Sequence, residues 1–144
     1  MAIVSVTRLH VRSWRFFVPF AIYAMRCASQ AKRSPGFLGG TLGNDAQLGN
    51  WTITLWESEE AMRSFRNSGV HRAAMPKLLN WCDEASYTHY TMDETGIPPA
   101  DTAYQRLSVG RISKVNHPSA AHAQGRPVSA GLPRFALKLR AVTR

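Results

Sequence analysis

The chain has 144 residues, of which 44% are hydrophobic and 19% are charged, and its formal net charge is +9. This length suits one domain with an extension, and the apolar fraction excludes a wholly disordered chain. A basic chain of this size first suggests nucleic acid or an anionic membrane as a partner. The charge is uneven, however. Residues 97–144 hold eight basic side chains and a single acidic one, so most of the excess belongs to the last third.

The cysteines and the N-terminal apolar run indicate the compartment. Cys27 and Cys82 are far apart and form no zinc or disulfide pattern, which is typical of free thiols in the cytosol. The uncharged run over residues 16–25 is about half the ~20 residues that a membrane-spanning helix needs. Arg26 follows it directly, where a signal peptide would need small residues. We therefore expect a cytoplasmic protein without a membrane span.

The first half of the chain predicts a strand, a helix and a hairpin. Residues 2–11 are rich in β-branched side chains, which favours a strand. Ser13 is placed to cap a helix over residues 14–32. The short runs 37–42 and 50–56 are separated by a turn and predict an antiparallel hairpin.

The second half of the core predicts a helix, a second helical piece and a last strand. Ser58 precedes two glutamates and is placed to cap a helix that ends near Asn67. Residues 70–81 predict the second helical piece, and residues 85–92 predict the last strand. The resulting order, βαββαβ, is typical of an α+β, ferredoxin-like fold with a four-stranded antiparallel sheet and helices on one face.

The chain is therefore predicted to consist of two parts. Residues 1–96 form the ferredoxin-like domain, and residues 97–144 form a basic C-terminal extension. Within the extension, residues 101–109 predict a short helix. Residues 110–133 predict mostly loop, because they lack hydrophobic periodicity. Residues 134–142 combine apolar and basic positions and suit either a strand or an amphipathic helix.

The sheet face opposite the helices is predicted to be bare in a monomer. An exposed apolar face of that size predicts a partner. Two such sheets packed face to face would bury it, so we expect a homodimer. The side chains assigned to this face are Val4, Val6, Thr52, Thr54, Trp56 and Tyr90.

The run WTITLWESEEAMRSFRNSGVHRAAM, residues 51–75, carries a family resemblance. A strand ending in Trp-Glu-Ser, an amphipathic helix and a Ser-x-x-hydrophobic-x-Ala-Ala segment resemble the antibiotic-biosynthesis-monooxygenase-like family, the dimeric α+β barrels. The opening run VTRLHVRSWRFFVPFAIYAMRCASQAKRSPGFLGG is similar to the spheroidene monooxygenase-like branch and related uncharacterised bacterial proteins. The resemblance covers about residues 2–92. It implies fold and dimerisation more strongly than it implies a reaction, because one fold hosts many activities.

The resemblance also implies something about haem. Haem-degrading members of the family use an Asn on the first strand, and a Trp and an axial His in the region of the second helix. In this sequence Thr7, Phe65 and Met75 stand at those positions. The resemblance therefore does not imply haem degradation by that mechanism, and it leaves two choices open, no cofactor or a haem bound in another way.

His71 is the first candidate for a catalytic residue, either as a general base or as a haem ligand. It lies four residues before Met75, on the same helix face, and imidazole titrates near neutral pH. His10 is the alternative haem ligand, and His89 is a further candidate to face a pocket. No set of cysteines and histidines predicts a metal site.

Two groups of side chains are predicted to contact a ligand. Three arginines flank the first strand–helix junction and are placed to bind an anionic substrate group or a haem propionate: Arg8, Arg12 and Arg15. The second group would line an apolar ligand pocket: Thr7, Trp14, Phe17, Trp51, Phe65, Met75 and Tyr87.

The sequence thus predicts a dimeric α+β barrel that binds a small hydrophobic molecule in the cleft between helices and sheet. Monooxygenase activity, cofactor-free or haem-dependent, is implied by the resemblance alone, and the sequence leaves open whether the protein is an enzyme. The alternative is a non-enzymatic binding or regulatory module. In that case the basic tail would contact an acidic partner, anionic lipid or nucleic acid, which the core itself is not expected to bind.

Overall fold

A computed structural model describes residues 1–128 and 130–142. The predicted order βαββαβ is present, and further elements follow it. In chain order the elements are β1 (Ala2–Val11), the 3-10 helix η1 (Trp14–Phe16), α1 (Phe17–Arg33), β2 (Phe37–Asn44), β3 (Asn50–Trp56), α2 (Glu59–Arg66), α3 (Gly69–Trp81), β4 (Cys82–Met92), α4 (Ala100–Ser108), β5 (Arg111–Ile112), α5 (Ala120–Ala123) and β6 (Arg134–Leu139).

The two predicted helix caps behave differently. Ser58 caps α2, since its Oγ accepts a hydrogen bond from the Ala61 N–H at 3.1 Å. Ser13 makes no such bond, and the chain forms η1 before α1 begins. Pro19 lies in the first turn of α1, where its missing N–H removes no helical hydrogen bond.

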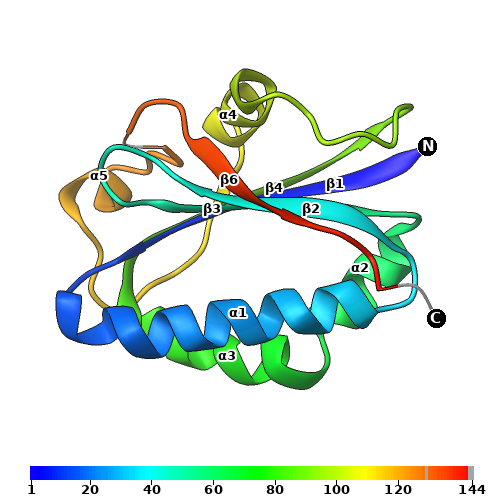
Figure 1. The fold of residues 1–144 in the computed structure, drawn as a ribbon. Helices are drawn as coiled ribbons and strands as arrows, with labels where there is room; N and C mark the ends of the chain where they lie inside the picture. The colour runs from blue at the N-terminus through cyan, green and yellow to red at the C-terminus, as the bar shows by residue number, and fades with distance from the viewer. Residues whose placement is uncertain (129, 143–144) are drawn as a thin grey trace.

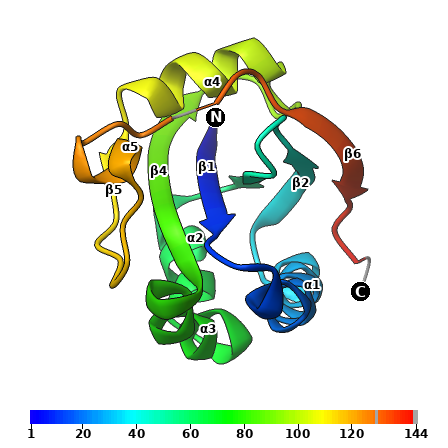
Figure 2. The same cartoon turned by 90° about the vertical axis from the view of Figure 1, so that its left-hand side faces the viewer.

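The sheet has six antiparallel strands in the order β5-β4-β1-β3-β2-β6 (Figure 1). Four of them are the predicted strands, and the two edge strands, β5 and β6, come from the C-terminal extension. The sheet lies between two layers of helices (Figure 2). Helices α1, α2 and α3 cover one face, here called the inner face, and α4 covers the other, here called the outer face.

The assignment of side chains to the two faces needs a correction. In the observed register Val4 pairs with Leu55 and Val6 pairs with Ile53. Directly paired residues of antiparallel strands share a face. Thr52, Thr54 and Trp56 therefore lie on the inner face, not with Val4 and Val6 as predicted. Alternation along each strand was predicted correctly, but the register between the strands was not.

The outer face is apolar, as predicted, but it is not bare. Ala103 and Leu107 of α4 are completely buried in a cluster with apolar side chains of β1 and β3. Val128 and Phe135 of the extension pack on the same cluster. The expectation that this face is open to a second copy is thus wrong, because the chain covers it with its own extension. Among the described residues, no helix is long and apolar enough to cross a membrane.

Candidate functional site

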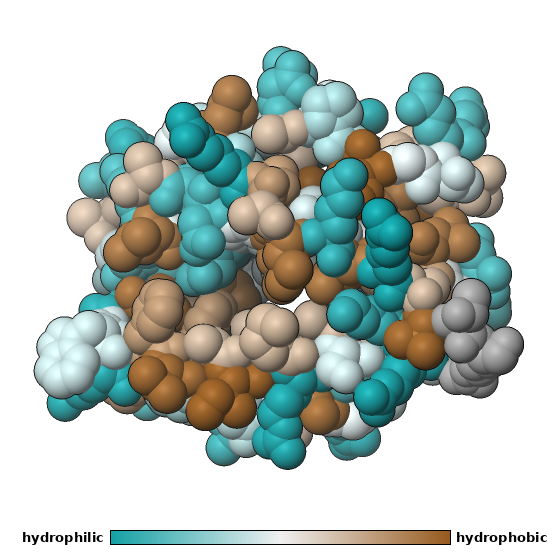
Figure 3. Space-filling view, viewed as in Figure 1, coloured by the Kyte–Doolittle hydropathy of each residue, from teal (hydrophilic) through white to brown (hydrophobic). Residues whose placement is uncertain are grey.

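The inner face of the sheet carries small polar side chains beneath α1 and α3. Ser5, Thr7 and Thr52 are half-buried there. The register places Thr7 between Thr52 on β3 and Tyr87 on β4. The space-filling view shows a narrow gap between the sheet and a band of apolar side chains along α1 (Figure 3). The inner face therefore offers hydroxyl groups that are incompletely covered by the helices.

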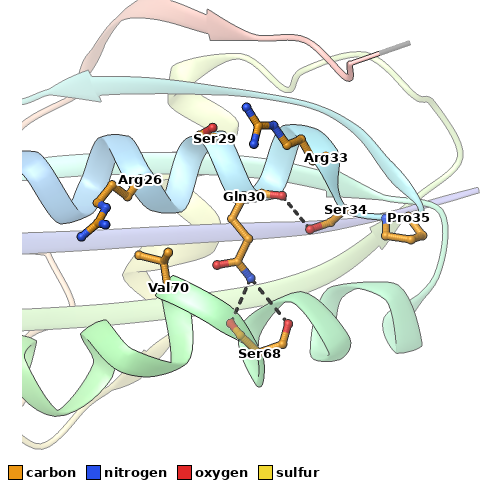
Figure 4. A pocket seen from close by; sticks show the side chains of 8 residues that line it. All are labelled: Arg26, Ser29, Gln30, Arg33, Ser34, Pro35, Ser68 and Val70. Carbon is orange, nitrogen blue, oxygen red and sulfur yellow. Dashed lines mark hydrogen bonds between the residues drawn. The ribbon is translucent and has the colours of Figure 1, made fainter. Parts of the chain in front are cut away.

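The helices over this face are held together by Gln30 of α1 (Figure 4). Its side-chain Nε2 donates to the carbonyl oxygens of Ser68 at 2.9 Å and Phe65 at 3.2 Å, at the junction of α2 and α3. Its Oε1 accepts from the backbone N–H of His71 at 3.0 Å. Gly69 adopts φ +57°, and a Cβ there would lie 3.0 Å from the Gln30 side chain. Only glycine suits that position, because both the backbone angle and the close approach disfavour a side chain.

The same junction fixes the side chain of His71. Its Nδ1 lies 3.1 Å from the carbonyl oxygen of Arg66. A carbonyl oxygen only accepts, so Nδ1 carries the proton and Nε2 holds the lone pair of the neutral ring. Burial lowers the pKa of His71 below its ordinary value of 6.5 and outweighs the bond to the Arg66 carbonyl, which raises it; the nearby Arg66 charge lowers the pKa further. At pH 7 His71 is therefore a neutral imidazole with a basic Nε2.

His71 stands at one end of a row of aromatic rings. The Phe65 ring lies 4.8 Å from the His71 ring and stacks on Trp56 at 5.0 Å, measured between centroids. Trp56 is 0% exposed, and its indole N–H has no hydrogen-bond partner. A buried donor without a partner costs about 1–3 kcal/mol. The row thus joins a neutral base to two packed rings, and it ends at a buried donor that has no partner.

The structure brings only some of the predicted pocket residues together. Thr7 and Tyr87 are neighbours on the inner face, and Phe65 belongs to the aromatic row. Trp51 lies on the outer face, where it is buried and stacks on Tyr104 of α4.

The other three predicted pocket residues are at the surface. Trp14 is 87% exposed because it belongs to η1 rather than to the helix over the sheet. Phe17 and Met75 are both 46% exposed. The fold therefore supports Thr7, Phe65 and Tyr87 as inner-face residues, and it does not place Trp14, Phe17, Trp51 or Met75 around a common pocket.

The three arginines that were predicted to contact an anion lie in different environments. Arg8 is 1% exposed, and its guanidinium is bonded to Asp45 and Glu84. Burial lowers the pKa of Arg8, but the bonds to the two carboxylates outweigh it and raise the pKa above its ordinary value. Its charge is thus used inside the protein, which corrects its role as a contact for an external anion.

Arg12 and Arg15 stay near the surface at the start of α1. The Nε of Arg12 donates to the carbonyl oxygen of Asn80 at 2.6 Å. The guanidinium groups of Arg12 and Arg15 lie 4.5 Å and 5.1 Å from the centroid of the Phe16 ring. These contacts fasten the entry to α1 against the end of α3, and they do not turn the two charges toward the inner face.

The Arg8 pair extends into a buried network that joins the core to the extension. Asp45 also accepts from the indole N–H of Trp51 at 2.9 Å and from the backbone N–H of Gly49 at 2.9 Å. Burial raises the pKa of Asp45, but these bonds and the Arg8 charge lower it below its ordinary value. Glu84 accepts from Ser119, at the start of α5, at 2.7 Å. The network is structural rather than part of the inner-face site.

The remaining candidates lie outside the aromatic row. His10 contacts the Asp83 carboxylate through Nδ1 at 2.6 Å. Cys27 and Cys82 are both free thiols, and burial raises the pKa of Cys27 to about 11 and that of Cys82 to about 12. No group of three or more metal-ligating side chains occurs in the part of the chain that the structure describes.

The residues present do not fit a haem. The position that the resemblance gives to an axial ligand is Met75, which lies at the surface of α3. The alternative ligand His10 is engaged with Asp83. Neither position therefore offers the axial ligand that the resemblance implies.

Two residues of the site were not found from the sequence. Gln30 was missed because a single polar residue inside a helix gives no signal, and only the fold reveals its contacts with the α2–α3 junction. Trp56 was placed on the wrong face, so its role beside Phe65 was missed. Its position in the Trp-Glu-Ser motif was the one available signal.

Comparison with known proteins shows likeness only to solved structures. No protein-family model matches the chain, and no curated protein matches it. A variant of SnoaB, a cofactor-independent oxygenase from Streptomyces nogalater, is 19% identical, with a TM-score of 0.55 over 68% of this chain and 98% of that one. Rv0793 from Mycobacterium tuberculosis is 15% identical, with a TM-score of 0.57 over 67% and 100% of the two chains. A candidate antibiotic biosynthesis monooxygenase from Nitrosomonas europaea is 13% identical, with a TM-score of 0.58 over 66% and 94%.

These comparisons confirm the predicted fold. The chain has the ferredoxin-like α+β fold of the antibiotic-biosynthesis-monooxygenase-like proteins, as the resemblance in residues 51–75 implied. At these identities the likeness is one of fold alone. About one third of this chain lies outside each match, a share as large as the C-terminal extension.

Proposed function

We propose that the protein binds a small aromatic molecule between its helices and the inner face of its sheet and oxygenates it without a cofactor. The observation that carries the proposal is the fixed tautomer of His71, a neutral base at the end of an aromatic row. A shared fold with SnoaB, described as a cofactor-independent oxygenase, supports the reaction class.

Each residue of the row has a role in this proposal. The Nε2 of His71 takes the proton of a phenolic hydroxyl, which leaves an electron-rich phenolate. Phe65 packs against both Trp56 and His71, and this contact holds the base in place beside the substrate. The phenolate reduces O₂, so that one oxygen atom enters the ring to give a quinone and the second leaves as water.

The test is oxygen uptake by the purified protein with a panel of polycyclic phenols. Loss of a general base lowers a rate by about 10²–10⁴-fold, and we expect His71→Ala to lower uptake within that range. His117→Ala is the matched control, because His117 is exposed in the extension and should not affect uptake. Equal rates in the two variants, or a Soret band that the wild type needs for activity, would contradict the proposal.

We further propose that the predicted homodimer forms through α1 rather than through the sheet. The outer face is filled by α4, so face-to-face pairing of two sheets is blocked. Val18, Ile22 and Met25 of α1 are exposed, and their spacing places them on one side of the helix. A single exposed apolar side chain is ordinary, but a stripe of this kind marks a contact surface.

The variant Ile22→Lys tests whether the dimer forms through α1. The charge should be buried without a partner in the dimer, so the variant should be a monomer at micromolar concentration where the wild type is a dimer. Light scattering after size-exclusion chromatography measures this. Glu60→Lys, an exposed change on α2, is the control and should stay dimeric. A monomeric wild type, or a dimeric Ile22→Lys, would contradict this interface.

A further inference from the structure

A second site lies where α2 meets β4 and the extension. A cavity of about 460 Å³ opens there, and three arginines line it, Arg63 and Arg66 from α2 and Arg111 from β5. Tyr87 and His89 of β4 complete the polar wall. Arg111 pairs with Tyr87 in the sheet register, so the two side chains share a face.

The charge in this cavity is not balanced by the protein. Glu59 is the acidic residue of the lining, and it pairs with Arg63 at 2.6 Å. Within residues 1–128 and 130–142, Arg66 and Arg111 have no ion pair with a carboxylate. Three cations beside a single acid leave an excess of two positive charges, which repel each other unless an anion lies between them.

The pKa of His89 responds to the positive charges around the cavity. Partial burial lowers its pKa, and the charges of Arg66, Arg111 and Arg63 lower it further, while Glu59 acts in the opposite direction. These charged groups and the Tyr87 hydroxyl are the titratable and charged neighbours that the cavity lining presents to it. The field at this ring is therefore set by arginines from two separate elements.

Arg111 reaches the cavity because the backbone at Gly110 passes close to β4. Gly110 lies between α4 and β5, and a Cβ on it would be 2.7 Å from the carbonyl oxygen of Tyr87. A larger residue would push β5 away from β4 and carry Arg111 out of the cavity. The C-terminal extension thus supplies one of the three arginines of the cavity.

We propose that this cavity binds a small dianion, a phosphate group or a dicarboxylate. The excess of two positive charges matches such a ligand, and guanidinium groups bind its oxygens in a bidentate manner. The volume suits a small phosphorylated or carboxylated metabolite rather than a polymer. This proposal does not rest on the oxygenation proposed above, although Arg66 also affects His71 through its carbonyl oxygen and its charge.

The test is calorimetric titration of the full chain at low salt with two probes, inorganic phosphate and succinate. We expect saturable binding of at least one, and the stronger probe identifies the chemical class. Arg111→Ala and Arg66→Ala should each weaken binding by about tenfold, since each removes a charge-assisted contact. Arg72→Ala is the control, because Arg72 is exposed on α3 and does not line the cavity.

A second measurement does not depend on a ligand. Arg111→Ala should raise the pKa of His89 in the free protein, since it removes a charge that lowers it, and Arg72→Ala should leave that pKa nearly unchanged. Nuclear magnetic resonance titration of the ring reports this. No saturable binding of either probe, or equal weakening by Arg72→Ala and Arg111→Ala, would overturn the proposal.

Discussion

The two faces of the sheet are covered in different ways. On the outer face, α4 completely buries a continuous apolar cluster that includes Val4, Val6 and Leu55. On the inner face, α1 and α3 leave Ser5 and Thr7 only half-buried. A sealed apolar contact stabilises a fold but offers a ligand no hydrogen bonds, whereas a partly covered polar face does. The outer face is thus sealed by apolar contacts, whereas the inner face combines an apolar cluster around Trp56 with hydroxyl groups that the helices cover incompletely.

The largest loss of stability is expected when Arg8, in the buried network, is replaced by a residue without a charge. Arg8→Ala leaves the carboxylates of Asp45 and Glu84 buried without their cation. Breaking a buried ion pair in this way costs about 3–5 kcal/mol, which should appear in the free energy of unfolding by urea. Arg72→Ala removes an exposed arginine and should cost almost nothing. Equal stabilities of the two variants would show that the buried network does not hold the extension on the core.

A smaller effect is expected from the contact of α4 itself. Leu107 is 0% exposed against the outer face, and Leu107→Ala should lower the free energy of unfolding by about 2–5 kcal/mol. Val109, two residues further on, is exposed, and Val109→Ala should be nearly neutral. If Leu107→Ala were also neutral, α4 would not be the cover of the outer face.

The smallest of these effects on stability is expected from His71 at the inner face, and it depends on pH. The pKa of His71 is lowered in the folded protein, so the unfolded chain binds a proton more readily as the pH falls below 6.5. Stability from this group is therefore present above pH 6.5 and is lost as the pH falls through the folded-state pKa. His71→Gln should flatten this part of the curve of unfolding free energy against pH, whereas His117→Gln should leave its slope as in the wild type. An unchanged curve for His71→Gln would contradict the burial of a neutral His71.

The sequence predicted the elements of the fold better than their relation to one another. Alternation within residues 2–11 and 50–56 was correct, because it depends only on neighbours along each strand. The pairing of Val4 with Leu55 depends on register, and nothing in either strand specifies it. The packing of α4 on the outer face was not predicted, for a similar reason. Residues 101–109 predicted a helix, but not the surface on which α4 packs.

Several residues of the inner face were predictable from the sequence, but the contacts that fix His71 were not. Helical spacing pointed to His71, but its tautomer depends on the carbonyl of Arg66 and its backbone on Gln30, one helix away. Arg8 had the right charge for an anion contact, yet Asp45 and Glu84 meet it only in the folded sheet. Contacts between distant segments, rather than residue types, decided which charges are available to a ligand.

The role proposed for the inner face rests most directly on the state of the His71 ring, and nitrogen NMR of the free protein measures it. The structure predicts a neutral ring at pH 7 with the proton on Nδ1 and the lone pair on Nε2, and a pKa below 6.5. A proton on Nε2 in the neutral ring, or a pKa at or above 6.5, would contradict it. In either case His71 would not be the base of the inner face.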